Sequence, residues 1–292
     1  MTGHMSILTC SNQKTATSFR LISKKLFGKR VEMFHSKNSL LLTDTTPVYT
    51  KRESPQLSII VPCYNEAENI KILVSAIDKA LSSVVWEIIF VDDNSPDNTI
   101  DVIRECAARD PRIRGIRRVG RKGLSSAVIE GVLSSSAPFA AVMDGDLQHD
   151  ECCLVPMLRE ITEHGYDLVV ASRYVVGGDD NGLDGIWRHF LSKGGSSFTR
   201  RLLSIQLQDP MSGFFMFKRA LFEKAATQMS GAGFKILLDL ICSSSLPLKI
   251  KEVPTTFKPR RYGESKLDFG VILNLLKFIA RMKVKKVLGG IS

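Results

Sequence analysis

The chain has 292 residues, of which 40 are Lys or Arg and 30 are Asp or Glu, so its formal net charge is +10. This length and an ordinary share of apolar residues fit a globular protein of one large or two smaller domains and exclude a collagen-like or wholly disordered chain. The positive charge favours anionic partners such as phospholipids and phosphorylated substrates, but not nucleic acid, because no recognition motif or aromatic stacking platform accompanies it.

Residues 1–56 are rich in Ser, Thr and Lys and lack sustained periodicity. We interpret them as a disordered or non-native extension, with a transit-peptide-like leader and a basic, membrane-attracted arm as alternatives. No apolar h-region follows the early basic residues, and no stretch approaches the roughly 20 apolar residues of a membrane-spanning helix. The six cysteines include no Cys-x-x-Cys pair, which argues against zinc and favours a reducing compartment. We therefore expect a cytoplasmic location.

From Leu57 onward, short apolar runs alternate with segments of helical periodicity. The expected strands are Leu57–Val61, Glu87–Val91, Ile113–Val119, Phe139–Met143 and Asp167–Ser172. The expected helices between them are Ala67–Leu81, Thr99–Ala108, Leu124–Leu133 and Leu154–His164. This alternation predicts an α/β domain with a mostly parallel sheet and helices on both faces, and we place it at residues 57–266.

Beyond Tyr174 the alternation ends. The segments expected there are a Gly/Asp-rich loop at 177–185, a basic helix at 186–205, an apolar run at 214–217, a helix at 234–243, a strand at 249–257, a basic loop at 258–266 and a terminal helix at 267–288. We interpret 267–292 as a basic amphipathic helix that lies at a membrane interface. The alternative is a helix that packs on the domain and carries solvated lysines.

Polar clusters follow three of the expected strands, at residues 62–66, 92–95 and 144–149. In an open parallel sheet, ligands bind at the carboxyl ends of the strands, so the three clusters predict one site. Each cluster alone has a simpler explanation. The run Asp-Asp-Asn-Ser, for example, also suits a turn and a helix N-cap.

Two carboxylates of the third cluster, Asp144 and Asp146, are separated by a single glycine. A hard divalent cation such as Mg²⁺ or Mn²⁺ would relieve this concentration of negative charge and could bridge diphosphate oxygens. The alternative is a surface turn rich in Asp and Gly. Glycine-rich dinucleotide motifs and P-loops are absent, which argues against oxidoreductases and P-loop hydrolases.

The chain resembles the inverting glycosyltransferases of GT-A fold in three sequence motifs. These are IIVPCYNEAEN at 59–69, FVDDNSPDNT at 90–99 and MDGDLQH at 143–149. Within that family, QDPMSGFF at 208–215 and FKPRRYGESKL at 257–267 resemble polyprenol-phosphate mannosyltransferases of the dolichol-phosphate mannose synthase type. The resemblance implies a GT-A fold with C-terminal interfacial helices. It also implies transfer of mannose from GDP-mannose to a polyprenyl phosphate at a membrane surface, by metal-dependent inversion.

The resemblance also implies roles for individual residues. The nucleotide would be bound by Pro62, Tyr64, Glu66 and Asp93, and the metal by Asp144, Asp146 and Gln148. The diphosphate or sugar would be contacted by Arg173, and the sugar or its pocket by Asp209 and Ser212. Arg188, Ser192, Arg260 and Lys266 would form the cradle for the acceptor phosphate. Spacing supports the cradle independently, because Arg188 and Ser192 would share a helix face. Solvated surface charges are the alternative for this set.

One segment departs from the family pattern, since the family commonly has Lys where Arg121 stands and Gly where Ser125 stands. Two other functions stay open. One is the same chemistry with a UDP-sugar such as UDP-glucose, and the other is a non-catalytic scaffold subunit that binds nucleotide sugars. A peripheral protein on the cytoplasmic face of a membrane, or one held there by an anchoring partner subunit, is the expected setting.

Overall fold

The structure is a computed structural model that describes residues 32–36, 39–43, 53–179, 207–231, 233, 235–244 and 247–259. The chain divides into two compact units, Met1–Arg52 and Glu53–Ser292. In the first unit, β1 (Glu32–Ser36) and β2 (Ser39–Thr43) pair antiparallel. The sequence pattern predicted no helix or strand in this stretch, and the β1–β2 hairpin is seen only in the structure.

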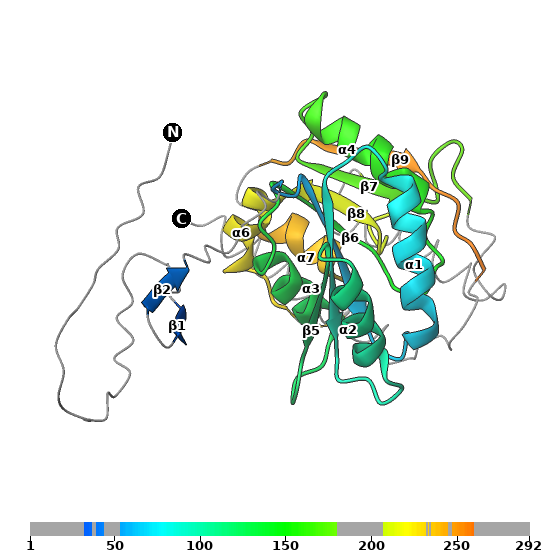
Figure 1. Cartoon of the computed structure of the whole chain (residues 1–292). Coiled ribbons are helices and arrows are strands. Elements are labelled where there is room, and N and C mark those ends of the chain that lie inside the picture. The colour runs from blue at the N-terminus through cyan, green and yellow to red at the C-terminus, as the bar shows by residue number, and fades with distance from the viewer. Residues whose placement is uncertain are drawn as a thin grey trace. The chain divides into compact units, whose positions relative to one another are not determined.

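In the second unit, the described residues form a seven-stranded sheet with the order β5-β4-β3-β6-β8-β7-β9 (Figure 1). Its strands are β3 (Leu57–Cys63), β4 (Trp86–Asp92), β5 (Ile113–Arg117), β6 (Phe139–Val142), β7 (Leu168–Ser172), β8 (Phe215–Lys218) and β9 (Ile250–Pro254). Strand β8 runs antiparallel to its neighbours β6 and β7, and the other pairs are parallel. The predicted, mostly parallel sheet is confirmed.

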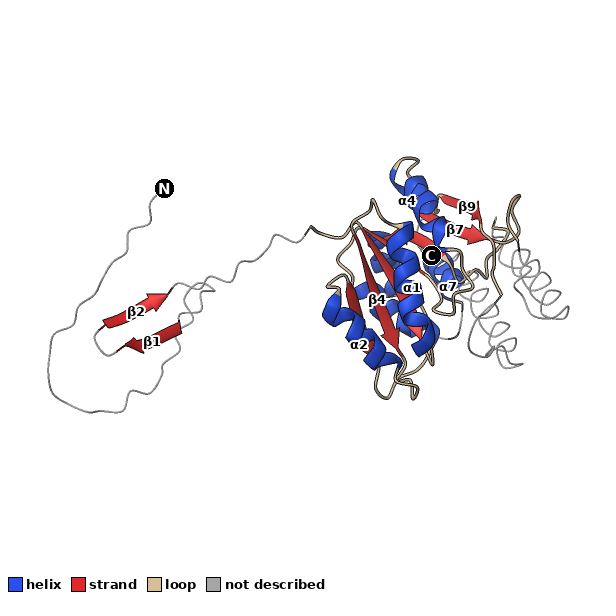
Figure 2. Ribbon diagram, turned by 45° about the vertical axis from the view of Figure 1, so that its right-hand side comes forward, coloured by secondary structure: helices blue, strands red, loops and turns tan. Residues whose placement is uncertain are grey.

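Helices cover both faces of this sheet, as Figure 2 shows for the face carrying α1 and α2. The helices are α1 (Ala67–Ala80), α2 (Thr99–Arg109), α3 (Leu124–Leu133), η1 (Glu151–Cys153), α4 (Leu154–Thr162), α6 (Arg219–Ala226) and α7 (Ile236–Ser243). One apolar cluster joins the sheet to α1, α2 and α4, and a second joins it to α3, α6 and α7. Successive strand residues belong to different clusters, Ile59 to the first and Ile60 to the second.

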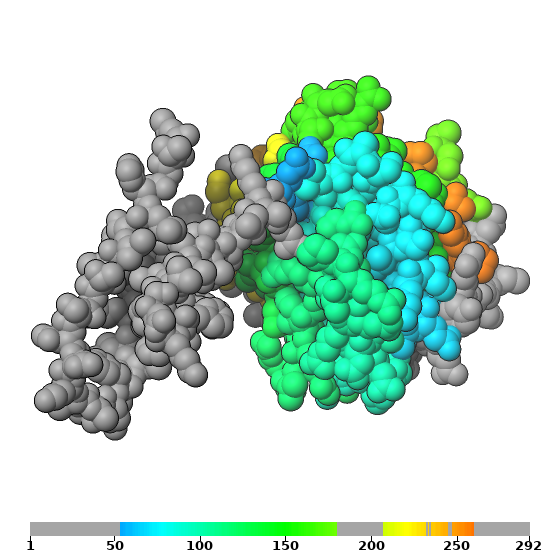
Figure 3. All heavy atoms as spheres, in the orientation of Figure 1, coloured from blue at the N-terminus to red at the C-terminus, as the bar shows by residue number. Residues whose placement is uncertain are grey.

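Burial explains why the strands read as continuous apolar runs. Every residue of β4 is buried, as expected for a parallel strand with helices on both sides. The outer sides of α1 and α2 form much of the surface seen in Figure 3.

Most expected elements are present with slightly different ends: β5 stops at Arg117 and β9 at Pro254. The sequence pattern did not predict η1 or α6. In the described part of the chain, no helix combines the length and the apolar character that crossing a membrane requires.

Candidate active site

Three tight turns follow β3, β4 and β6 at the carboxyl edge of the sheet. Asn65 and Asn94 each have a φ of 59°, and Leu147 has a φ of 63°. Asn tolerates this left-handed conformation, whereas Leu rarely adopts it. Strained backbone gathers at functional sites, and the strained Leu147 lies between two predicted metal ligands.

The adjacent carboxylates Asp92 and Asp93 have different partners. Asp92 is fully buried and accepts hydrogen bonds from both the backbone N–H and the hydroxyl of Ser95, so it shapes the turn. Asp93 lies 2.6 Å from Nη1 of the buried Arg118, and the Gly123 N–H donates to its second oxygen at 2.7 Å. A charge-assisted pair of this kind fixes the orientation of the Asp93 carboxylate.

The other predicted nucleotide residues lie at the end of β3, beside Asp93. Pro62 is the next-to-last residue of β3, and both Tyr64 and Glu66 are partly buried. The backbone N–H of Asp93 donates to the carbonyl of Cys63 at 3.0 Å, which joins the ends of β3 and β4. The structure therefore brings all four predicted nucleotide residues to one edge.

The predicted metal motif follows β6. Its residues Asp146 and Gln148 are buried, whereas the Asp144 side chain is 36% exposed. The backbone N–H of Gln148 donates to Asp146 at 3.2 Å. The Gln148 carboxamide NH₂ donates to the carbonyl of Lys258, also at 3.2 Å, which fixes the carboxamide.

These side chains fit a hard divalent cation. The described residues contain no group of three His, Cys, Asp or Glu side chains that could hold a metal ion. Two carboxylates and a carboxamide oxygen would supply only part of a coordination shell. Mg²⁺ is commonly bound in this way, by one or two carboxylates together with substrate phosphates and water.

Gly213 lies against the same motif. A Cβ at this position would be 2.5 Å from Oδ2 of Asp144 and 3.3 Å from Nε2 of His149. His149 Nε2 is itself 3.3 Å from that Asp144 oxygen, and the His149 ring packs with Phe214 at a centroid distance of 5.3 Å. The close approach requires glycine at position 213.

The end of β7 carries Arg173, which pairs with the fully buried Asp209. Arg173 Nε and Nη2 donate to the two oxygens of Asp209 at 2.7 and 2.9 Å. The Ser212 hydroxyl donates to the carbonyl of Ala171 at 2.7 Å. Asp209 and Ser212 thus hold the segment before β8 against the end of β7, and Arg173 lies at the same edge as the metal motif.

Lys235, directly before α7, was not among the residues that the sequence motifs indicated. Burial lowers the pKa of Lys235 to about 8; repulsion from Arg173 acts in the same direction, and attraction to Asp209 and Asp144 opposes it. These interactions place Lys235 in the electrostatic surroundings of the site. The one available signal was a lysine directly before the apolar run Ile-Leu-Leu of a predicted helix.

Four predicted residues lie outside the described part of the chain. They are the members of the proposed acceptor cradle: Arg188, Ser192, Arg260 and Lys266. The helices predicted at 186–205 and 267–288 also lie outside it.

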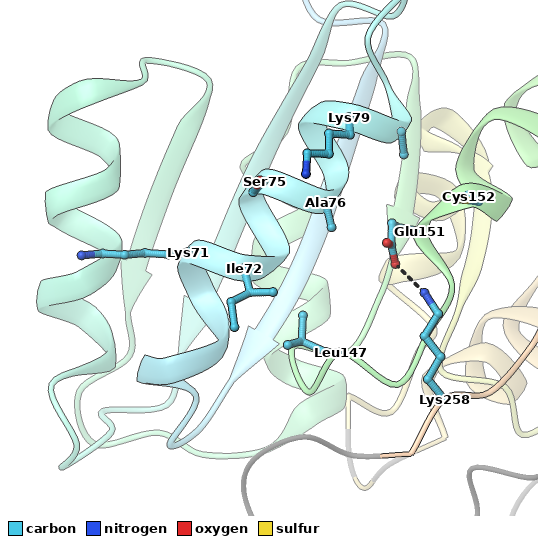
Figure 4. A pocket seen from close by; sticks show the side chains of 10 residues that line it. Lys71, Ile72, Ser75, Ala76, Lys79, Leu147, Glu151, Cys152 and Lys258 are labelled. Atoms are coloured by element: carbon cyan, nitrogen blue, oxygen red, sulfur yellow. Dashed lines mark hydrogen bonds and ion pairs between the residues drawn. The ribbon is translucent and has the colours of Figure 1, made fainter.

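A groove of about 720 Å³ lies beside the site, between α1 and the loop that carries the metal motif (Figure 4). It is lined by Ile72 of α1, by Leu147 and by Lys258, but by neither carboxylate of the motif. The Lys258 ammonium is 3.2 Å from Glu151, and its backbone N–H donates to the carbonyl of Gln148 at 2.7 Å. The groove therefore borders the loop that carries the metal motif without including its carboxylates, and Lys258 forms part of the groove wall.

Residues 58–225 match the family described as glycosyl transferase family 2. The chain belongs to this family. It is 39% identical over 229 residues to a dolichol-phosphate mannosyltransferase of Pyrococcus furiosus, an alignment covering 78% of this chain and 63% of that protein. A dolichol-phosphate mannosyltransferase of Saccharomyces cerevisiae is 34% identical over 244 residues, covering 80% and 89% of the two chains. The resemblance noted in the motifs is confirmed, and the chain is a glycosyltransferase.

Solved structures confirm the fold. Glucosyl-3-phosphoglycerate synthase from Mycobacterium tuberculosis, in complex with UDP, superposes with a TM-score of 0.55 at 20% identity, covering 77% of this chain and 80% of that one. The same enzyme in complex with Mn²⁺, UDP and its product superposes with a TM-score of 0.53 at 18% identity, covering 80% and 79%. The family 2 chain therefore has the predicted GT-A fold.

Proposed function

We propose that this glycosyltransferase moves mannose from GDP-mannose to the phosphate of a dolichyl-type polyprenyl lipid, with inversion at the anomeric carbon and with Mg²⁺ or Mn²⁺. The observation that carries the proposal is the position of the Asp144–Gln148 motif. It lies at the carboxyl edge of the sheet, with Asp93 and the Arg173–Asp209 pair, in a chain 34% and 39% identical to named dolichol-phosphate mannosyltransferases.

Asp144, Asp146 and Gln148 would hold the divalent cation. When bound, the cation supplies neutralisation of the negative charge that develops on the departing diphosphate. The carboxylate of Asp93, held by Arg118 and Gly123, would accept hydrogen bonds from the nucleotide.

Arg173 would direct its guanidinium to the diphosphate or sugar. Its pair with Asp209 fixes the guanidinium plane, so little side-chain entropy is lost on binding. A lipid phosphate is already ionised at neutral pH, so the attacking oxygen needs no strong general base. Catalysis then depends on positioning and on charge stabilisation.

The acceptor phosphate would lie on Arg188, Ser192, Arg260 and Lys266. We propose a peripheral position on the cytoplasmic face of a membrane, or attachment through an anchoring partner. The net charge of +10 supports contact with anionic headgroups.

The test is transfer of radiolabelled mannose from GDP-mannose to a short polyprenyl phosphate, with and without Mg²⁺ or Mn²⁺. Asp146→Ala should lower the rate about a thousandfold, a loss of ~4 kcal/mol in transition-state stabilisation. Asp101→Ala is the matched control, because the Asp101 side chain forms an exposed pair with Arg104 on α2. Labelling from UDP-glucose alone would replace mannose by glucose, and binding of nucleotide sugars without any transfer would favour the scaffold function.

A further inference from the structure

Lys235 is the residue directly before α7, and among the described residues its ammonium has no hydrogen-bond or ion-pair partner. No hydrogen bond or ion pair joins it to another residue in the part of the chain that the structure describes. Lys235 is partly buried, and a partly buried ammonium without a partner is unfavourable until an anion pairs with it.

The nearby carboxylates do not fill that role. Among the residues that the structure describes, the charges that act on Lys235 are those of Arg173, Asp209 and Asp144. Both oxygens of Asp209 are bonded to Arg173, and Asp144 is in contact with His149. Hydrogen bonds place the residues just before Lys235 at the same edge of the sheet: the carbonyl of Gly233 accepts from Ser125 near the start of α3, and Gly123, the residue before that helix, donates to Asp93. Among the described residues, Lys235 is therefore an uncompensated cation at the edge that carries the metal motif.

The loop before Lys235 is anchored at two points. The buried carboxylate of Asp239 accepts hydrogen bonds from the backbone N–H and hydroxyl of Ser230, both at 2.8 Å, and from the backbone N–H of Gly231 at 3.2 Å. The Ser125 hydroxyl donates to the carbonyl of Gly233 at 2.8 Å. A lysine on an anchored loop is preorganised for binding.

We propose that Lys235 binds a phosphate oxygen of a substrate, in the donor diphosphate or in the acceptor monophosphate. The inference rests on the proposed function and adds a phosphate-binding residue to it. An ammonium is a compact point charge that matches a single phosphate oxygen, whereas sugar hydroxyls carry no charge to balance it.

The experiment compares wild type with Lys235→Met, Lys235→Arg and the control Lys224→Met, which removes an exposed lysine from α6. Calorimetry measures the binding of GDP and GMP in the presence of Mg²⁺. Steady-state kinetics measure KM for the polyprenyl phosphate and for the donor. Thermal denaturation reports any loss of folding.

If Lys235 holds the donor, Lys235→Met should weaken GDP binding about tenfold or more and leave GMP binding nearly unchanged. If it holds the acceptor, KM for the polyprenyl phosphate should rise by a similar factor while GDP binding stays the same. Lys235→Arg should recover part of either loss. Unchanged binding and KM in Lys235→Met would overturn the inference, even if the melting temperature changed.

Failure of the proposed function would look different. If wild type binds UDP rather than GDP, the same comparison between diphosphate and monophosphate is made with UDP and UMP, and it still tests Lys235. If mannose transfer proceeds normally in Lys235→Met with unchanged constants, only the role of Lys235 is lost.

Discussion

The pair formed by Arg173 and Asp209 allows the sharpest stability prediction. Asp209→Asn keeps the size of the side chain but removes the negative charge, and it leaves the guanidinium of Arg173 without its carboxylate. The Asp209 side chain is 0% exposed and that of Arg173 is 11% exposed, so water cannot replace the lost partner. Breaking a buried pair by removing one partner costs about 3–5 kcal/mol, and we expect about 3 kcal/mol here because Arg173 retains some exposure.

In a domain of this size, 1 kcal/mol corresponds to roughly 2–4 °C in Tm, so Asp209→Asn should lower Tm by about 6–12 °C. Thermal and urea denaturation followed by circular dichroism provide the measurement. Asp101→Asn is the control, because its pair with Arg104 is more than half exposed on both sides and should change stability by less than about 0.5 kcal/mol. Equal effects of the two substitutions would refute the reasoning.

The neighbouring charge of Lys235 adds a second part to this prediction. In Asp209→Asn, Arg173 and Lys235 repel each other with less compensation. Adding Lys235→Met should therefore restore about 1 kcal/mol, which makes the double substitution less destabilising than the sum of the two single ones. Strict additivity would show that the two cations are not coupled through Asp209.

Gly213→Ala should lower kcat about tenfold or more and weaken metal activation, measured by titration with Mn²⁺, because its methyl group would displace the Asp144 carboxylate. Gly131→Ala, whose methyl would meet the Ile60 side chain of β3 at 2.5 Å, should lower the free energy of unfolding by about 1–3 kcal/mol but leave metal activation unchanged. Asp167 has a third role: burial raises its pKa, but a hydrogen bond from Lys218 and one from a backbone N–H outweigh burial and leave the pKa below its ordinary value. The stabilisation that ionised Asp167 provides is thus present above the pKa of the unfolded state and is lost as pH falls through the pKa of the folded state. Asp167→Asn should remove this pH dependence, which amounts to less than about 1 kcal/mol. Urea midpoints measured between pH 3 and 7 would show the change.

Local pattern was enough to predict most of the domain. The strand that ends before Asp144 was visible as a short apolar run, and the position of the motif at the carboxyl edge followed from the parallel alternation. The direction of β8 was not predictable from such a pattern, because an apolar run has the same composition in either direction. Its antiparallel pairing with β6 brings the loop at Gly213 onto the metal motif.

Lys235 was missed for a related reason. Its functional surroundings come from β6, from β7 and from the segment before β8, which are distant in sequence. Periodicity assigns a lysine at a helix start to the solvent, since most lysines are there. The packing of α7 against the second face of the sheet partly buries this one, and no local pattern encodes that packing.

The charges of the site also bear on the order in which its ligands would bind. Asp144 and Asp146 concentrate negative charge, while Arg173 and Lys235 supply positive charge beside them, and Asp209 already balances Arg173. The carboxylates would repel a free nucleotide diphosphate, and Lys235 would repel a free divalent cation. A cation already bound to the diphosphate satisfies both groups at once.

We therefore predict that Mg²⁺ and GDP bind with positive cooperativity, each raising the affinity of the other by the same factor. Calorimetric titration of GDP at several Mg²⁺ concentrations measures that factor, and independent binding of the two would contradict this account of the site.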